Sequence, residues 1–251
     1  MEDPRPIPFG PLDALAFSPK NPQWLVVLCH GYGASGTDLA GLAEAIVDDA
    51  PALAERAEFV FPAAPIDMAE FGMPGGRAWW PINMQRLLQI TQSGSLLELV
   101  DETPPGLIEA AAQLDAGIKS RLEALGLGED RLILGGFSQG AMVTTHLAFT
   151  GAIHPRLLVV MSGALICRPE WTKSLDAAGD TAAQLAVFQS HGKYDPVLPF
   201  VGAQMLGQLI ESKGIPLDFW AFGGEHGVPA QIIQKLAKRI EQLDQETSDG
   251  K

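Results

Sequence analysis

The sequence predicts an α/β protein with a doubly wound, mostly parallel sheet and helices on both faces of that sheet. Short apolar runs alternate along the chain with longer segments whose apolar residues recur at helical spacing. Several runs, such as 132–134 and 157–161, are apolar at every position, which is typical of parallel strands covered on both faces. We expect a single domain, residues 1–251, because 251 residues with 47% hydrophobic content can form one sizeable core.

Composition narrows the classes of partner. The net charge is −13 and no basic patch is visible, which argues against nucleic acid as a partner. No run approaches the length of a membrane span, and residues 1–10 lack the basic start and apolar core of a signal peptide, so we expect no stable membrane insertion and a cytoplasmic location. Cys29 and Cys167 show neither a CxxC pattern nor zinc-type spacing with histidine, and a disulfide between them is possible by number but not supported by pattern. The sequence is compatible with a homodimer.

The first half of the chain begins with a proline-rich arm, residues 1–22, in which residues 12–17 suit a short edge strand. Residues 24–29 and 57–62 read as buried strands. Between them lies a glycine-rich loop, followed by a helix that Thr37 or Asp38 can cap.

The segment at about 65–105 reads as a cap-like insertion, because it is long and rich in proline and glycine. Trp79 and Trp80 are candidates for lining an apolar substrate pocket, with core packing as an equally weighted alternative. Met142, one turn into a later predicted helix, is a third candidate. Residues 82–99 suit one or two short helices that lie over the site.

The second half continues the alternation of strands and helices. We expect helices from Pro104 to Gly126, at about 200–212 and after Pro229. Strands are expected at 132–134, 157–161, 185–190 and 217–222. Residues 166–183 have no clear assignment, and residues 245–251 read as a polar tail.

The stretch from 131 to 142 joins a buried strand to a helix through Gly136-Phe137-Ser138-Gln139-Gly140. Glycines permit a turn too sharp for residues with a Cβ, and Ser138 stands at its apex. The helix that follows directs its N-terminal N–H groups at the same point. This strand–turn–helix context is that of a nucleophile elbow in an α/β-hydrolase, whereas an inert serine in an ordinary turn is the alternative.

A serine hydroxyl needs a base, and the base needs an orienting carboxylate. In this fold the chain order is serine, acid, histidine, and Ser138, Asp195 and His226 follow three predicted strands in that order. His191 is a rival base but precedes Asp195 in the same loop. Glu225 is a rival acid, although adjacent residues rarely orient each other. Asp195-Pro196 could also be a plain turn.

The loop after residues 24–29 supplies the second part of the expected site. Hydrolases of this fold form the oxyanion hole from the N–H of the residue after the nucleophile, here Gln139, and from an N–H of such a loop, for which we nominate Tyr32. Residues 31–36 also spell G-x-G-x-x-G, but no acidic residue clearly ends a second strand at the offset that a dinucleotide site requires. His30 is expected to hold the loop.

Together, Gly135–Gly140, Leu28–Gly33, His191–Val197 and Gly224–His226 resemble the phospholipase/carboxylesterase family, which includes the acyl-protein thioesterases. The resemblance implies a serine carboxylic ester hydrolase without metal or cofactor, acting on short to medium acyl esters through an acyl-enzyme. It also implies Ser138, Asp195 and His226 as the triad. The alternatives are a lysophospholipase, an acyl (protein) thioesterase, and a non-enzymatic module that binds an acyl ligand. Ala141 departs from the glycine that many members have.

Overall fold

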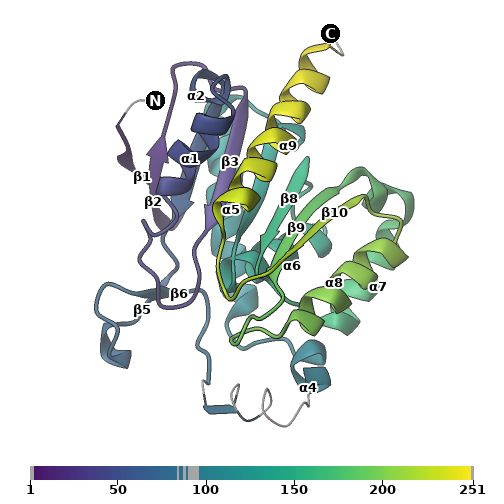
Figure 1. Ribbon diagram of the computed structural model, residues 1–251. Helices are drawn as coiled ribbons and strands as arrows, with labels where there is room; N and C mark the ends of the chain where they lie inside the picture. The colour runs from purple at the N-terminus through teal and green to yellow at the C-terminus, as the bar shows by residue number, and fades with distance from the viewer. Residues whose placement is uncertain (1–2, 84, 87–88, 90–95, 250–251) are drawn as a thin grey trace.

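An eight-stranded sheet forms the centre of the computed structural model, which describes residues 3–83, 85–86, 89 and 96–249 (Figure 1). The strand order is β1-β2-β4-β3-β7-β8-β9-β10. The six strands from β4 to β10 in this order run parallel, and β2 and β1 extend the sheet antiparallel at one side. This arrangement confirms the predicted fold class. The strands are β1 Arg5–Phe9, β2 Leu12–Phe17, β3 Trp24–Cys29, β4 Ala57–Pro62, β7 Leu132–Phe137, β8 Leu157–Met161, β9 Ala186–Gly192 and β10 Leu217–Phe222.

Helices cover both faces of the sheet. One face is covered by α1 and α9, which lie in front of the strands in Figure 1, and the other carries α5, α6, α7 and α8. Alternate residues of one strand therefore enter different cores: Leu25 and Val27 pack on the α5–α8 side, and Val26 and Leu28 on the α1–α9 side. The helices are α1 Gly41–Asp49, α2 Leu53–Arg56, α4 Leu96–Asp101, α5 Leu107–Leu125, α6 Gln139–Phe149, α7 Arg168–Ala178, α8 Phe200–Ser212 and α9 Ala230–Asp249.

The N-terminal arm differs from its prediction. Residues 5–9 form the edge strand β1, so β2 is hydrogen-bonded on both sides and the prediction that 12–17 is an edge was wrong. Pro6 and Pro8 are tolerated in β1 because an edge strand has a partner on one side only.

Helix boundaries differ in three further places. The first helix begins at Gly41, and neither Thr37 nor Asp38 caps it, since the residue before it is Ala40 without a capping side chain. The unassigned stretch 166–183 contains α7 and a 3₁₀ helix, Gly179–Gln184. The last helix continues into the predicted polar tail and reaches Asp249.

The segment predicted as a cap-like insertion contains a small hairpin of β5 (Ile66–Asp67) and β6 (Arg77–Ala78), with a 3₁₀ turn at Ala69–Phe71 between them. One or two short helices are expected at 82–99. Within that range, residues 84, 87–88 and 90–95 lie outside the described residues, and α4 begins at Leu96. One domain with a cap at about 65–105 stays a prediction. Within the described residues, no helix combines the length and the apolar character needed to cross a membrane.

Candidate active site

Ser138 occupies the sharp turn between β7 and α6. Its φ of 55° and ψ of −118° lie outside the regions that residues with a Cβ usually adopt, so the backbone is strained at this point. The flanking glycines make the turn feasible. A Cβ on Gly136 would lie 2.5 Å from the Cys29 carbonyl oxygen, and one on Gly140 would lie 2.1 Å from the same atom. The sequence pattern around Ser138 is therefore required by the close approach of β7, α6 and β3.

The structure brings the three predicted side chains, Ser138, Asp195 and His226, into one hydrogen-bonded chain. His226 Nε2 lies 2.9 Å from Ser138 Oγ, and His226 Nδ1 lies 2.6 Å from Asp195 Oδ2. The three residues follow β7, β9 and β10, whose carboxyl ends share one edge of the sheet. In this geometry the imidazole can accept the serine proton while the carboxylate holds its Nδ1–H.

Asp195 is held by donors on both of its oxygens. Its Oδ1 accepts the backbone N–H groups of Val197 and Leu198, each at 2.8 Å. Its Oδ2 lies 2.6 Å from His226 Nδ1 and 3.2 Å from His191 Nε2. Burial opposes ionisation of this carboxyl, but the hydrogen bonds from His191, His226 and Leu198 outweigh it and hold the pKa of Asp195 well below its usual range.

His191, the rival base set aside in favour of His226, contacts the site in a way that the sequence did not predict. It was considered as a rival base, yet its fully buried side chain faces Asp195 and the Leu198 carbonyl oxygen, which lies 2.8 Å from its Nε2. The Nδ1 atom has no hydrogen-bond partner among the described residues, so a proton there would be buried and unpaired. His191 therefore acts as a donor through Nε2. The spacing of four residues before Asp195 is its only sequence signal.

The two N–H groups nominated for the oxyanion hole, those of Tyr32 and Gln139, come from the loop after β3 and from the first residue of α6. Neither donates to an acceptor within the described part of the chain. The first N–H groups of a helix have no intrahelical acceptor, so the Gln139 N–H is available for an anion.

The Gln139 side chain has a role of its own that the sequence pattern did not reveal. Its buried amide accepts the Trp79 N–H at 2.9 Å and donates to the Trp80 carbonyl oxygen at 2.8 Å. The amide thereby ties residues 79–80 to the start of α6. Trp79 packs in the core: its side chain is fully buried, and its indole N–H donates to the His30 carbonyl oxygen at 2.9 Å.

His30 holds the loop after β3, as expected. Its Nδ1 donates to the Gly31 carbonyl oxygen at 2.8 Å, and its Nε2 accepts the Ala64 N–H at 3.1 Å. Burial lowers the pKa of this imidazole, which favours the neutral form that this pair of bonds needs. The loop that carries Tyr32 is thus fixed from both sides.

Comparison with known proteins gives the family. The family model described as Phospholipase/Carboxylesterase matches residues 14–243. The chain belongs to this family. Acyl-protein thioesterase 1 of Kluyveromyces lactis is 31% identical over 75% of this chain and 78% of its own, and that of Eremothecium gossypii is 29% identical over 76% and 74%. The crystal structure of esterase PE8 matches with a TM-score of 0.72 at 24% identity, covering 93% of this chain and 98% of that one. A carboxylesterase from Mesorhizobium loti matches with a TM-score of 0.71 at 17% identity, covering 95% and 99%.

An apolar cavity of about 430 Å³ opens one helical turn from the nucleophile of this phospholipase/carboxylesterase family member. Of the three residues nominated for a substrate pocket, Trp80 and Met142 line this cavity and Trp79 does not. At one place the wall is charged: Arg86 and Glu102 form a two-armed ion pair, in which Nη1 and Oε2 are 2.7 Å apart. The remaining wall includes Ile82, Leu99, Val100, Leu165, Ile166 and Leu198.

Ser162, just after β8, supports the loop of His226. Its φ of 50° is in the left-handed region, and its hydroxyl donates to the Gly227 carbonyl oxygen at 3.1 Å. This contact leaves no local pattern in the sequence, because the two residues are 65 positions apart. Among the described residues, the one group of three side chains close enough together to be potential metal ligands lies outside this site, at His146, Cys167 and Glu170.

Proposed function

We propose that this protein is a serine carboxylic ester hydrolase in which Ser138 is the nucleophile, His226 the general base and acid, and Asp195 the residue that orients His226. The observation that carries the proposal is the hydrogen-bonded chain from Ser138 Oγ through His226 to Asp195 Oδ2. Membership of the phospholipase/carboxylesterase family supports the same class of reaction.

The proposed reaction has two halves. Ser138 Oγ attacks the acyl carbon while His226 Nε2 takes the hydroxyl proton, and the N–H groups of Tyr32 and Gln139 stabilise the oxyanion. His226 then gives the proton to the departing alcohol, which leaves an acyl-enzyme. A water molecule attacks the acyl-enzyme with His226 again as base, and the carboxylic acid and free Ser138 result.

The cavity suggests the acyl part of the substrate. Its apolar wall near Trp80 and Met142 suits a short to medium acyl chain, which gains free energy for each methylene group removed from water. Thioesters are the second candidate, since the curated relatives are named acyl-protein thioesterases. Both substrate classes share the acyl-enzyme step, so they differ only in the leaving group.

The test is hydrolysis of p-nitrophenyl butyrate and octanoate, and of matched thioesters, by wild type and by Ser138→Ala. We expect turnover that falls at least roughly 10⁴-fold in the variant, because the nucleophile is removed. Ser212→Ala, at the exposed end of α8, is the matched control and should keep wild-type rates. Turnover that survives in Ser138→Ala would reject the proposal, and absence of turnover by wild type on every ester and thioester would favour a binding module.

A further inference from the structure

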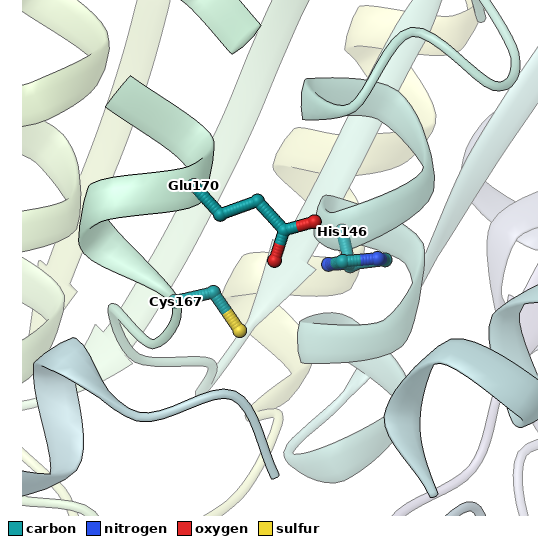
Figure 2. A group of neighbouring side chains, drawn as sticks. All are labelled: His146, Cys167 and Glu170. Carbon is teal, nitrogen blue, oxygen red and sulfur yellow. The ribbon is translucent and has the colours of Figure 1, made fainter. Parts of the chain in front are cut away.

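Three potential metal ligands meet where α6 packs on α7, outside the active site. His146 lies on α6, Cys167 precedes α7, and Glu170 lies in the first turn of α7. One ligand atom from each residue lies within 4.8 Å of those of the other two. Figure 2 shows the thiol and the carboxylate pointing across from α7 toward the imidazole. His146 and Cys167 are buried and Glu170 is half-buried, so the group is largely shielded from solvent.

The charges in this cluster are not balanced by the protein. The Glu170 carboxylate forms no hydrogen bond or ion pair with any described residue, and the nearby Arg168 is paired with Asp101 at 2.7 Å. Burial lowers the pKa of His146, although Glu170 acts in the opposite direction. Burial raises the pKa of the Cys167 thiol to about 11, with a lowering contribution from Thr103 and a raising one from Glu170. The Glu170 carboxyl group therefore has the imidazole of His146 and the thiol of Cys167 as its neighbours in the cluster.

We propose that His146, Cys167 and Glu170 bind one divalent transition-metal ion, with Zn²⁺ as the best fit, and that this ion links α6 to α7. Sulfur, nitrogen and oxygen donors together suit zinc and its neighbours in the first transition row, whereas magnesium and calcium prefer oxygen ligands alone. On binding, the thiol proton leaves to solvent and a sulfur–metal bond forms. Two charges on the ion then balance the thiolate and the carboxylate, which leaves the buried site neutral.

Trp171 opposes metal binding at His146, so a substitution of Trp171 tests the proposal. Its indole N–H donates to His146 Nδ1 at 3.2 Å. An ion bound at Nδ1 has to displace this donor, and an ion bound at Nε2 puts a proton on Nδ1, where it faces the indole N–H. In either case the Trp171 hydrogen bond competes with the metal. Replacing the indole with a phenyl ring therefore strengthens binding without touching a ligand.

The position of the site connects it to the rest of the molecule. α6 begins directly after Ser138, and Ile166, adjacent to Cys167, lines the apolar cavity. An ion between His146 and Cys167 would fix the cavity wall to the helix that carries the nucleophile. Because the ligands are 21 and 3 residues apart along the chain, no zinc-type spacing appears in the sequence.

The experiment is titration of the metal-free full-length protein with Zn²⁺ by calorimetry and with Co²⁺ by absorption spectroscopy. We expect one ion per chain and, with Co²⁺, a thiolate-to-metal charge-transfer band. Cys167→Ser and Glu170→Gln should each weaken Zn²⁺ binding by at least about 10- to 100-fold, since even the loss of a residue that supports a ligand costs that much. Trp171→Phe should tighten it about five- to tenfold, because one competing hydrogen bond is removed.

Two controls leave the cluster intact. Cys29→Ala removes the other buried thiol, and His154→Asn removes an exposed histidine paired with Glu129; both should bind zinc as wild type does. Absence of one-to-one binding by wild type would overturn the proposal. Unchanged affinity in Cys167→Ser and Glu170→Gln would also overturn it, because the ion would then be held elsewhere. If Cys167→Ser fails to fold, the half-exposed Glu170→Gln and the ligand-preserving Trp171→Phe decide the matter through opposite changes in affinity.

Discussion

Replacing Asp195 with asparagine tests how the structure fixes the imidazole of His226. Two backbone N–H groups, those of Val197 and Leu198, donate to Oδ1 at 2.8 Å each. The amide oxygen of an asparagine therefore stays at that position, since an NH₂ group there would face two donors. The NH₂ group is then placed where Oδ2 was, beside His226 Nδ1 and His191 Nε2.

The consequence for catalysis follows from the tautomer. An NH₂ group facing Nδ1 requires Nδ1 to accept, so the imidazole proton moves to Nε2, the atom that lies 2.9 Å from Ser138 Oγ. His226 then cannot take the serine proton. We expect kcat in Asp195→Asn to fall roughly 10⁴-fold, the size found for this change in other serine triads and equal to about 5.5 kcal/mol of transition-state stabilisation.

Asp195→Asn should also change how the free energy of unfolding depends on pH. The folded-state pKa of Asp195 lies below its usual value, so its carboxylate stabilises the fold above the unfolded pKa of about 3.9, and this contribution is lost as pH falls through the folded pKa. The free energy of unfolding by urea should therefore differ most between wild type and variant at neutral pH. The difference should narrow below about pH 4.

The assay is initial-rate hydrolysis of p-nitrophenyl butyrate at saturating substrate and neutral pH, with circular dichroism to show that the variant is folded. Asp130→Asn is the matched control, because Asp130 is exposed and precedes β7, at the opposite end of that strand from Ser138. A folded Asp195→Asn enzyme that keeps more than about a tenth of the wild-type kcat would refute the reasoning from the tautomer.

Three other substitutions test the surroundings of the site. His191→Phe removes a hydrogen-bond donor from Asp195, and hydrogen bonds to charged groups contribute about 1.5–3 kcal/mol, so we expect the free energy of unfolding by urea at pH 7 to fall by that amount. His191→Gln keeps a donor and should lose less stability. Equal losses in the two variants would contradict this. Ser162→Ala removes the hydrogen bond to the Gly227 carbonyl oxygen, worth about 1 kcal/mol, and should lower kcat about fivefold with KM unchanged in steady-state assays; an unchanged kcat would count against it. Met142→Trp fills part of the cavity and should lower kcat/KM for octanoate relative to butyrate by about fourfold per excluded methylene group, and parallel changes for both esters would show that the cavity does not hold the acyl chain.

The sequence predicted those parts of the molecule that depend on local patterns. Apolar runs marked the parallel strands, and the glycines around Ser138 marked a turn that the close approach to the Cys29 carbonyl oxygen requires. The order of Ser138, Asp195 and His226 after three of the parallel strands was visible in the sequence, and parallel strands place their carboxyl ends at one edge. The family resemblance is confirmed by the match over residues 14–243.

Contacts between segments that are distant in sequence were not predicted. The Gln139 amide binds the backbone of residues 79–80, and Ser162 binds Gly227, so neither role leaves a pattern around the residue itself. The edge strand was misplaced because prolines at positions 6 and 8 suggested an unpaired arm, although an edge strand needs partners on only one side. His146, Cys167 and Glu170 come together only through the packing of α6 on α7.

The most direct measurement of the central claim is labelling of the native enzyme with a fluorophosphonate, followed by mass spectrometry of its peptides. An activated serine reacts with this probe, whereas an ordinary serine hydroxyl does not. We predict one adduct per chain, at Ser138, with esterase activity lost in proportion to labelling and no adduct in His226→Ala. An unlabelled Ser138 in an active enzyme, or an adduct at another residue that accounts for the loss of activity, would contradict the account.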